Sequence, residues 1–328
     1  MSEVLVEVWR GPFLECQHRG DAVVVNAKGD IMEAWGNPSI NILPRSSSKI
    51  LQALPLVESG AADKFGLGSE QLALACASHT GSPIHTQGVQ TWLSGMDLSE
   101  SDLRCGTHWP TGREAANELV KAGEKPCQYH NNCSGKHSGF LTLNKHLGGD
   151  AEYNDINHPV QKAALQAFEE VTGEASTGYG IDGCSAPNFA TSLTGLATAM
   201  ARIGAGTRGE GSLRLVEAMA KHPLLVAGEG RACSELMAAI GGRVVLKTGA
   251  EGVYIAILPD QGLGVALKIE DGATRAAECV IAALLVRLGV ADMDDPMVRK
   301  RLSPPLKNAA DLVVGGIRPV AGLIGLRG

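Results

Sequence analysis

Residues 44–51 read PRSSSKIL, and within this stretch two residues separate Ser46 from Lys49. The stretch lies where a β-rich N-terminal region gives way to a predicted helix. Because residues i and i+3 of a helix share a face, we expect Lys49 to lie beside the Ser46 hydroxyl. A buried, neutral lysine could accept the serine proton and make Ser46 a nucleophile. The same spacing also arises by chance, and adjacent serines can simply cap a helix.

Two later motifs support the catalytic interpretation. Ser78 follows a predicted helix, and the run Lys247-Thr248-Gly249 ends a predicted strand. This order of motifs is similar to that of penicillin-binding proteins and serine β-lactamases, although the middle motif lacks their Asp and Asn, so a β-lactam is not the expected substrate. We predict a second pair, Ser78 with Lys247, in which the two lysines of the site lower each other's pKa. His79 is a competing candidate for the base.

The ends of the chain read as strands and its middle reads as helices. Gly-bearing turns separate strand-like runs within residues 22–35 and 253–268, which predicts two hairpins, and residues 243–247 add a strand. The helices predicted between them are Glu70–Ala77, Arg113–Ala122, Pro159–Val171 (capped by Asn157 and ended by Gly173), Phe189–Ile203 and Leu213–Lys221.

This order predicts an α/β (α+β) fold in which both termini build one mostly antiparallel sheet. The Ala-rich helix 273–288 should cover the sheet, and the helical middle should form an inserted lobe. We expect a single catalytic domain over residues 1–328, with a sheet lobe at about 1–45 and 240–328 and a helical lobe at about 46–239.

Charge and hydropathy exclude several classes of protein. The net charge is −6 with no basic stripe, which argues against nucleic acid or a membrane surface as a partner. The acidic N-terminus does not resemble a signal peptide, so we expect a cytoplasmic protein in which the eight cysteines are reduced or bind metal. The longest nearly apolar run, residues 279–286, is shorter than the roughly 20 residues that span a bilayer.

A cluster of metal-binding residue types occurs in the middle of the chain. Residues 127–137 read CQYHNNCSGKH and hold two cysteines and two histidines. This density favours zinc, although four ligands from one short segment would strain a tetrahedral site. Cys184 is the best distant thiol to complete such a site. Asp182 could hold the amino group of a small zwitterionic substrate or could cap a turn.

Several stretches resemble the rhizobial-type (class 3, thermolabile) L-asparaginases, in family order over nearly the whole chain. They are RSSSK at 45–49, CASH at 76–79, NNCSGKH at 131–137, IDGC at 181–184, the segment 222–231 and KTGAEG at 247–252. The resemblance implies a fold related to serine β-lactamases and penicillin-binding proteins. It also implies a homodimer that hydrolyses L-asparagine to L-aspartate and ammonia.

The same resemblance implies roles for individual residues. The nucleophile and its lysine fall on Ser46 and Lys49, and the second pair falls on Ser78 and Lys247. The intermediate would be an aspartyl ester on Ser46, and no organic cofactor is implied. The implied substrate-binding residues are Arg45, His137 and Asp182.

The family's zinc site, which uses a lysine ligand beside two cysteines, falls on Cys133, Lys136 and Cys184. This assignment leaves Cys127 and His130 outside the site. The zinc is expected to support substrate binding and not to supply the attacking hydroxide.

Two other functions are compatible with the sequence. The first is a glutaminase or another small-amide hydrolase of the same fold, because one methylene changes binding by only about 1–3 kcal/mol. The second is a non-catalytic zinc or amino-acid binding protein that uses the serine–lysine pairs to hold a ligand. The C-terminal stretch Leu323-Ile324-Gly325-Leu326 departs from the family pattern.

Overall fold

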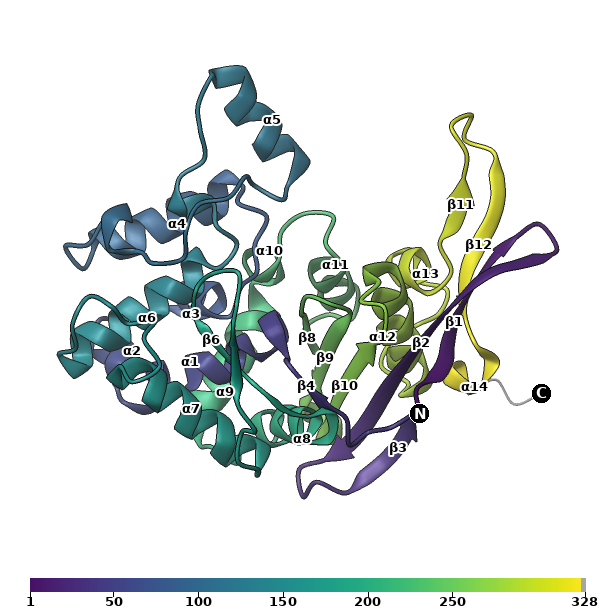
Figure 1. Ribbon diagram of the computed structural model, residues 1–328, viewed down its shortest axis with the longest axis horizontal. Helices are drawn as coiled ribbons and strands as arrows, with labels where there is room; N and C mark the ends of the chain where they lie inside the picture. The colour runs from purple at the N-terminus through teal and green to yellow at the C-terminus, as the bar shows by residue number, and fades with distance from the viewer. Residues whose placement is uncertain (326–328) are drawn as a thin grey trace.

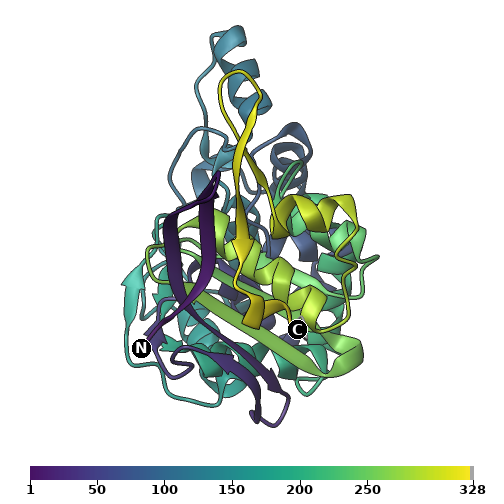
Figure 2. The same ribbon diagram turned by 90° about the vertical axis from the view of Figure 1, so that its right-hand side faces the viewer.

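The two ends of the chain build one sheet in the computed structural model, which describes residues 1–325. In these residues the sheet has eight strands in the order β11-β12-β1-β2-β10-β9-β8, with β3 paired to β2 (Figure 1, Figure 2). Every pairing is antiparallel, which confirms the predicted sheet. The strands are β1 (Glu3–Arg10), β2 (Phe13–Asn26), β3 (Ile31–Trp35), β8 (Val245–Thr248), β9 (Val253–Leu258), β10 (Leu263–Ile269), β11 (Pro305–Lys307) and β12 (Val313–Pro319).

Both predicted hairpins are present, and helices cover the sheet. β2 pairs with β3, and β9 pairs with β10. β9 is buried along its whole length, as is the run 22–25 of β2. A strand that buries successive side chains is covered on both faces. α12 (Thr274–Arg287), the predicted covering helix, packs on β9 and β10, and α8 (Leu193–Gly204) packs on these two strands and β2.

The middle of the chain is helical, as predicted. Its helices, together with two near the C-terminus, are α1 (Lys49–Glu58), α2 (Ala61–Lys64), α3 (Ser69–Ala75), α4 (Pro83–Ser94), α5 (Arg113–Ala122), α6 (Ser134–Leu147), α7 (Pro159–Thr172), α9 (Glu210–Lys221), α10 (Pro223–Val226), α11 (Ala232–Ala239), α13 (Pro296–Leu302) and α14 (Ala321–Ile324). In Figure 1, α1 to α7 and α9 gather to the left of the sheet, whereas α13 and α14 lie at its right, near β11 and β12. The division of the chain into two lobes of one domain stays a prediction.

The helix expected to begin at Phe189 is shorter than predicted. It begins at Leu193, because Ser192 caps α8 by accepting the backbone N–H of Gly195 at 2.8 Å. The residues before it form the short strands β6 (Pro187–Phe189) and β7 (Thr191–Ser192). β6 pairs with β5 (Tyr179–Ile181), and β7 pairs with β4 (Asn41–Ile42). These pairings place the segment 179–192 beside the chain that leads into Ser46.

The N-terminal cap of α7 also differs from the prediction. The cap is His158, whose Nδ1 accepts the backbone N–H of Val160 at 3.1 Å. Asn157 instead donates its backbone N–H to Asp155 Oδ1 at 2.7 Å. The predicted end of the helix is confirmed, because Gly173 adopts a φ of +81° there.

The C-terminal stretch that departs from the family pattern is only partly described. Leu323 is buried in α14, whereas Leu326 lies outside the described residues. All eight cysteines fall within residues 1–325 and are free thiols. None of the helices in this part of the chain is long and apolar enough to cross a membrane.

Candidate active site

The first serine–lysine motif lies in a tight turn before α1. Arg45–Ser48 form a 3₁₀ turn, η1, in which Arg45 has a φ of +54°, a strained conformation for a residue with a side chain. Ser47 and Ser48 donate their hydroxyls to the carbonyls of Pro44 and Arg45 at 2.7 and 2.9 Å. Ser46 is half-buried, and its hydroxyl has no such partner among residues 1–325. The turn therefore leaves the Ser46 hydroxyl free to react.

Lys49 is buried but is not bonded to Ser46. Its Nζ donates to the carbonyl of Ala77 and, at 3.4 Å, to that of Asn132. Through these two bonds, Lys49 links the residue before Ser78 to the cysteine- and histidine-rich stretch 127–137. The role of Lys49 as the base for Ser46 stays a prediction.

The structure brings Ser78 and Lys247 together. Lys247, on β8, donates to Ser78 Oγ at 2.8 Å and to the carbonyl of Thr248 at 2.9 Å. Burial, followed by the charge of Lys49, lowers the pKa of Lys247 to about 7. Near neutral pH, a large share of Lys247 is the neutral amine, which is the form that accepts a proton.

His79 is enclosed in a structural hydrogen-bond network. Its ring is fully buried and stacks on His85 with centroids 4.7 Å apart. Nδ1 accepts the backbone N–H of Gly81 at 3.2 Å, so Nε2 carries the proton and donates to Ser134 Oγ at 2.9 Å. Burial, followed by the neighbouring His85, lowers the pKa of His79 well below its usual range. Both ring nitrogens are engaged, which argues against His79 as the base.

The two serine–lysine motifs meet where β8 ends. A Cβ added to Gly249 would lie 2.6 Å from the carbonyl oxygen of Pro44 and 3.3 Å from the backbone nitrogen of Ser47. Only glycine permits so close an approach of two backbones. The Lys-Thr-Gly run therefore packs directly against the turn that carries Ser46.

Asp182 lies beside the same turn and pairs with Arg45. Nε and Nη2 of Arg45 lie 2.9 and 2.8 Å from Asp182 Oδ1, which also accepts the backbone N–H of Gly183 at 2.8 Å. Both charged side chains are partly exposed. A guanidinium and a carboxylate next to a free serine are complementary to the α-carboxylate and α-ammonium of an amino acid.

The three residues of the predicted zinc site lie together in a buried cluster. Lys136 Nζ is 3.0 Å from Cys184 Sγ, and the Cys133 thiol, which donates to Asn132 Oδ1 at 3.2 Å, lies close to the same sulfur. The neighbouring Cys133 thiol, followed by the charge of Lys136, holds the pKa of the Cys184 thiol well below its usual range. Burial would lower the pKa of Lys136, but the Cys184 thiolate raises it above its ordinary value. The cluster therefore brings one amine and two thiols together in a buried site.

Cys127 and His130, which the predicted zinc site leaves out, contact each other. Cys127 Sγ lies 3.3 Å from Nδ1 of His130. Over residues 1–325, no three His, Cys, Asp or Glu side chains gather as they would around a metal ion. The predicted set contains only two residues of these types beside Lys136, and zinc binding stays a prediction.

His137 lies behind this cluster. Burial lowers the pKa of His137 to about 4, so the ring is neutral at neutral pH. Its Nδ1 is 2.9 Å from the hydroxyl of Tyr153. The ring lies close to Cys184, and its Nε2 is shielded from solvent and has no hydrogen-bond partner among the described residues. Its role in substrate binding stays a prediction, and direct contact with a substrate would need a rearrangement.

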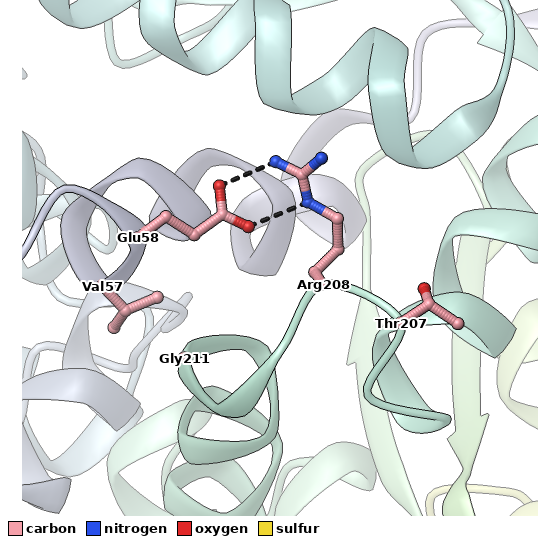
Figure 3. Close-up of a pocket in the computed structure, with 5 residues that line it drawn as sticks. All are labelled: Val57, Glu58, Thr207, Arg208 and Gly211. Atoms are coloured by element: carbon pink, nitrogen blue, oxygen red, sulfur yellow. Dashed lines mark hydrogen bonds and ion pairs between the residues drawn. The ribbon is translucent and has the colours of Figure 1, made fainter.

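Two surface hollows lie apart from these residues. One, of about 730 Å³, lies between α4 and α5 and includes Thr80 in its wall. The other, of about 550 Å³, contains the ion pair of Arg208 with Glu58 (Figure 3). Arg208 also pairs with Glu170, so it ties α1 to α7. Neither hollow is lined by a residue of the serine–lysine pairs, and we assign the second a structural role.

Residues 6–319 match the family model described as L-asparaginase II. The chain belongs to the L-asparaginase II family. The matched range includes every residue of the candidate active site described above. The match confirms the predicted relation to L-asparaginases. A search of curated proteins finds no significant match.

Solved structures similar to this L-asparaginase II family member have low sequence identity. A β-lactamase from Mycobacterium bovis is 13% identical, with a TM-score of 0.43 over 79% of this chain and 89% of that chain. An octameric penicillin-binding protein homologue from Pyrococcus abyssi is 14% identical, with a TM-score of 0.36 over 84% of this chain and 75% of that chain. The octamer belongs to that homologue, and a homodimer of the present chain stays a prediction.

The structure adds two residues to the site of this L-asparaginase II family member. Asn188 is buried, its Oδ1 accepts the backbone N–H of Arg45 at 3.3 Å, and its Nδ2 has no partner among the described residues. Asn188 directly precedes the helix predicted from Phe189, and no motif marks its position beside the serine turn. Tyr153 lies in a loop without a motif, and only its contact with His137 shows that it supports the site.

Proposed function

We propose that this protein is an L-asparaginase that hydrolyses L-asparagine to L-aspartate and ammonia through a serine nucleophile. The observation that carries the proposal is the hydrogen bond from Lys247 to Ser78, 2.8 Å long, against the turn of Ser46 in an L-asparaginase II family member. A lysine with a pKa of about 7 can accept a serine proton at neutral pH. Ammonia release from L-asparagine tests the proposal.

In the first half of the reaction, Ser46 Oγ attacks the carbon of the side-chain amide. The Ser46 proton passes through the Ser78 hydroxyl to Nζ of Lys247, with Lys49 as the other acceptor that the sequence predicts. Backbone N–H groups near Ser46 hold the oxygen that becomes negatively charged. The proton then moves to the amide nitrogen, the C–N bond breaks, and ammonia leaves. An aspartyl ester remains on Ser46.

In the second half, water hydrolyses the ester. The Ser78–Lys247 pair takes a proton from the water as its oxygen attacks the ester carbon. The bond to Ser46 Oγ then breaks, Ser46 recovers its proton, and L-aspartate leaves. No organic cofactor takes part in either half.

The Arg45–Asp182 pair binds the amino-acid end of the substrate in this proposal. We expect Asp182→Asn to raise KM for L-asparagine by about 10- to 100-fold, because a charge-assisted hydrogen bond contributes about 1.5–3 kcal/mol. The amide oxygen of the substituted side chain can still accept the Gly183 N–H, so the turn should keep its shape. Steady-state kinetics measure this effect, and an unchanged KM with a reduced kcat would place Asp182 elsewhere in the mechanism.

Zinc fits the buried cluster by the chemistry of its donors. Two thiols are soft ligands, and Lys136 already contacts one of them at 3.0 Å. We propose that Cys133, Lys136 and Cys184 hold Zn²⁺, which would supply positive charge that supports substrate binding. Lys136 can ligate only as the free amine, so binding should weaken as the pH falls.

We expect zinc to co-purify with the wild-type protein and to be largely absent from Cys184→Ser, because serine is a much poorer zinc ligand. Cys279→Ser is the matched control, since that buried thiol bonds to the carbonyl of Leu302 on another part of the fold. Metal analysis of the three proteins measures the difference. Equal zinc contents in Cys184→Ser and the wild type would exclude Cys184 as a ligand.

A further inference from the structure

Tyr153 is fully buried in the loop between α6 and α7, and its hydroxyl has two partners. The hydroxyl oxygen lies 2.8 Å from the backbone nitrogen of Arg104 and 2.9 Å from Nδ1 of His137. A backbone N–H can only donate, so the oxygen accepts from Arg104. The single hydroxyl proton is then directed at the other partner, which is Nδ1 of His137.

This contact determines which nitrogen of His137 carries the ring proton. A neutral imidazole has one N–H and one lone pair. Because Nδ1 uses its lone pair to accept from Tyr153, the proton is on Nε2. Nε2 is buried and has no hydrogen-bond partner among the described residues, although Cys184 lies close to the ring.

We propose that Tyr153 is a positioning residue that holds His137 in the Nε2–H tautomer, so that Nε2 presents an N–H and not a lone pair to its buried surroundings. Lys136, whose Nζ is 3.0 Å from the Cys184 sulfur, is the donor that contacts this sulfur directly. The effect on a metal rests on the proposed function, but the tautomer itself does not.

The alternative tautomer would change the chemistry of the cluster. With the proton on Nδ1, the ring would present a lone pair at Nε2. His137 could then serve as a further protein ligand of a metal held by the neighbouring cluster, as in zinc sites that serve structure and not catalysis. In the Nε2–H tautomer that lone pair would be absent.

Long-range ¹H–¹⁵N NMR spectra of the full-length protein, labelled in histidine and stripped of metal, test the tautomer directly. His137→Gln identifies the His137 signals by their loss. We expect the Nε2–H pattern in the wild-type protein. A protonated Nδ1 in the wild type would overturn the proposal.

Tyr153→Phe then tests the role of the hydroxyl. We expect the His137 signals to move towards the Nδ1–H pattern. Thr142→Val is the matched control, because it removes a buried hydroxyl from α6, the helix that carries His137. Thr142 accepts there from Trp92 Nε1 at 3.1 Å. A His137 pattern unchanged in Tyr153→Phe would overturn the proposal. If that variant does not fold, scalar coupling between the wild-type Tyr153 hydroxyl proton and Nδ1 decides instead, and its absence would count against the assignment.

Zinc and activity provide separate outcomes. After Zn²⁺ is added to the wild type, we expect the Nε2–H signal of His137 to persist, whereas ligation through Nε2 would remove it and overturn the proposal. We expect Tyr153→Phe to lower kcat/KM for L-asparagine by about 10- to 100-fold, as loss of a supporting residue does in metal sites, and Thr142→Val to stay near wild type. If the wild type releases no ammonia, the proposed function fails while the NMR result still stands.

Discussion

Ser46→Ala is expected to stop ammonia release from L-asparagine, with a fall in kcat of at least about 10³-fold. The turn before α1 engages the hydroxyls of Ser47 and Ser48 with backbone carbonyls and leaves that of Ser46 without a partner in the described structure. Removal of the nucleophile prevents the ester from forming, whatever the state of the surrounding residues. A stopped assay of ammonia under saturating substrate measures the loss.

Neighbouring serines provide the controls for this result. Ser47→Ala removes a hydroxyl that bonds only to the carbonyl of Pro44 within the turn, so we expect this variant to retain most of the activity. Ser78→Ala should lower the rate strongly, because it breaks the proton path to Lys247. A labelled aspartyl ester trapped on the protein by rapid acid quench would map to Ser46. An ester on Ser78, with activity retained in Ser46→Ala, would move the nucleophile to Ser78.

Lys247→Arg is expected to lower kcat/KM by about 10²- to 10⁴-fold, the usual contribution of a general base. Arginine keeps the positive charge but does not lose its proton, so the variant separates proton transfer from electrostatics. In the proposed mechanism, the active form of Lys247 is the neutral amine, and burial lowers its pKa to about 7. The rate should therefore fall about tenfold per pH unit below that pKa and level off above it.

Lys49→Met tests the origin of this pH dependence. After burial, the charge of Lys49 is the next cause that lowers the pKa of Lys247. Without that charge the pKa of Lys247 should rise, and the rising limb of the pH–rate profile should move to higher pH. A profile that stays in place would show that another group is the base.

The fold was largely predictable because its signals are local. Short β-rich apolar runs on either side of Gly-bearing turns predicted the hairpins of β2 with β3 and of β9 with β10. The Ala-rich run of α12 identified the helix that covers them. The short strand β6 was missed, since its three residues are stabilised by pairing with β5 and not by their own propensity.

The identity of the serines and lysines of the site was predictable from motifs. The hydrogen-bond partners of Lys49 were not, because they depend on packing. The spacing of Ser46 and Lys49 indicated a helical face, but in the structure Lys49 turns to the carbonyls of Ala77 and Asn132. The contact of Lys247 with Ser78 spans 169 positions in sequence, and only the order of the motifs and the family resemblance predicted this pair. Such long-range contacts leave no local pattern in the sequence.

The most direct test of the central claim is ammonia release by the purified wild-type protein from L-asparagine and L-glutamine, measured side by side at equal concentrations. The proposed function predicts release from L-asparagine, with L-glutamine slower because one added methylene costs about 1–3 kcal/mol in a fitted site. Faster release from L-glutamine would make the protein a glutaminase. Release from neither amide, with binding of either amino acid retained, would contradict the assignment as an amidohydrolase.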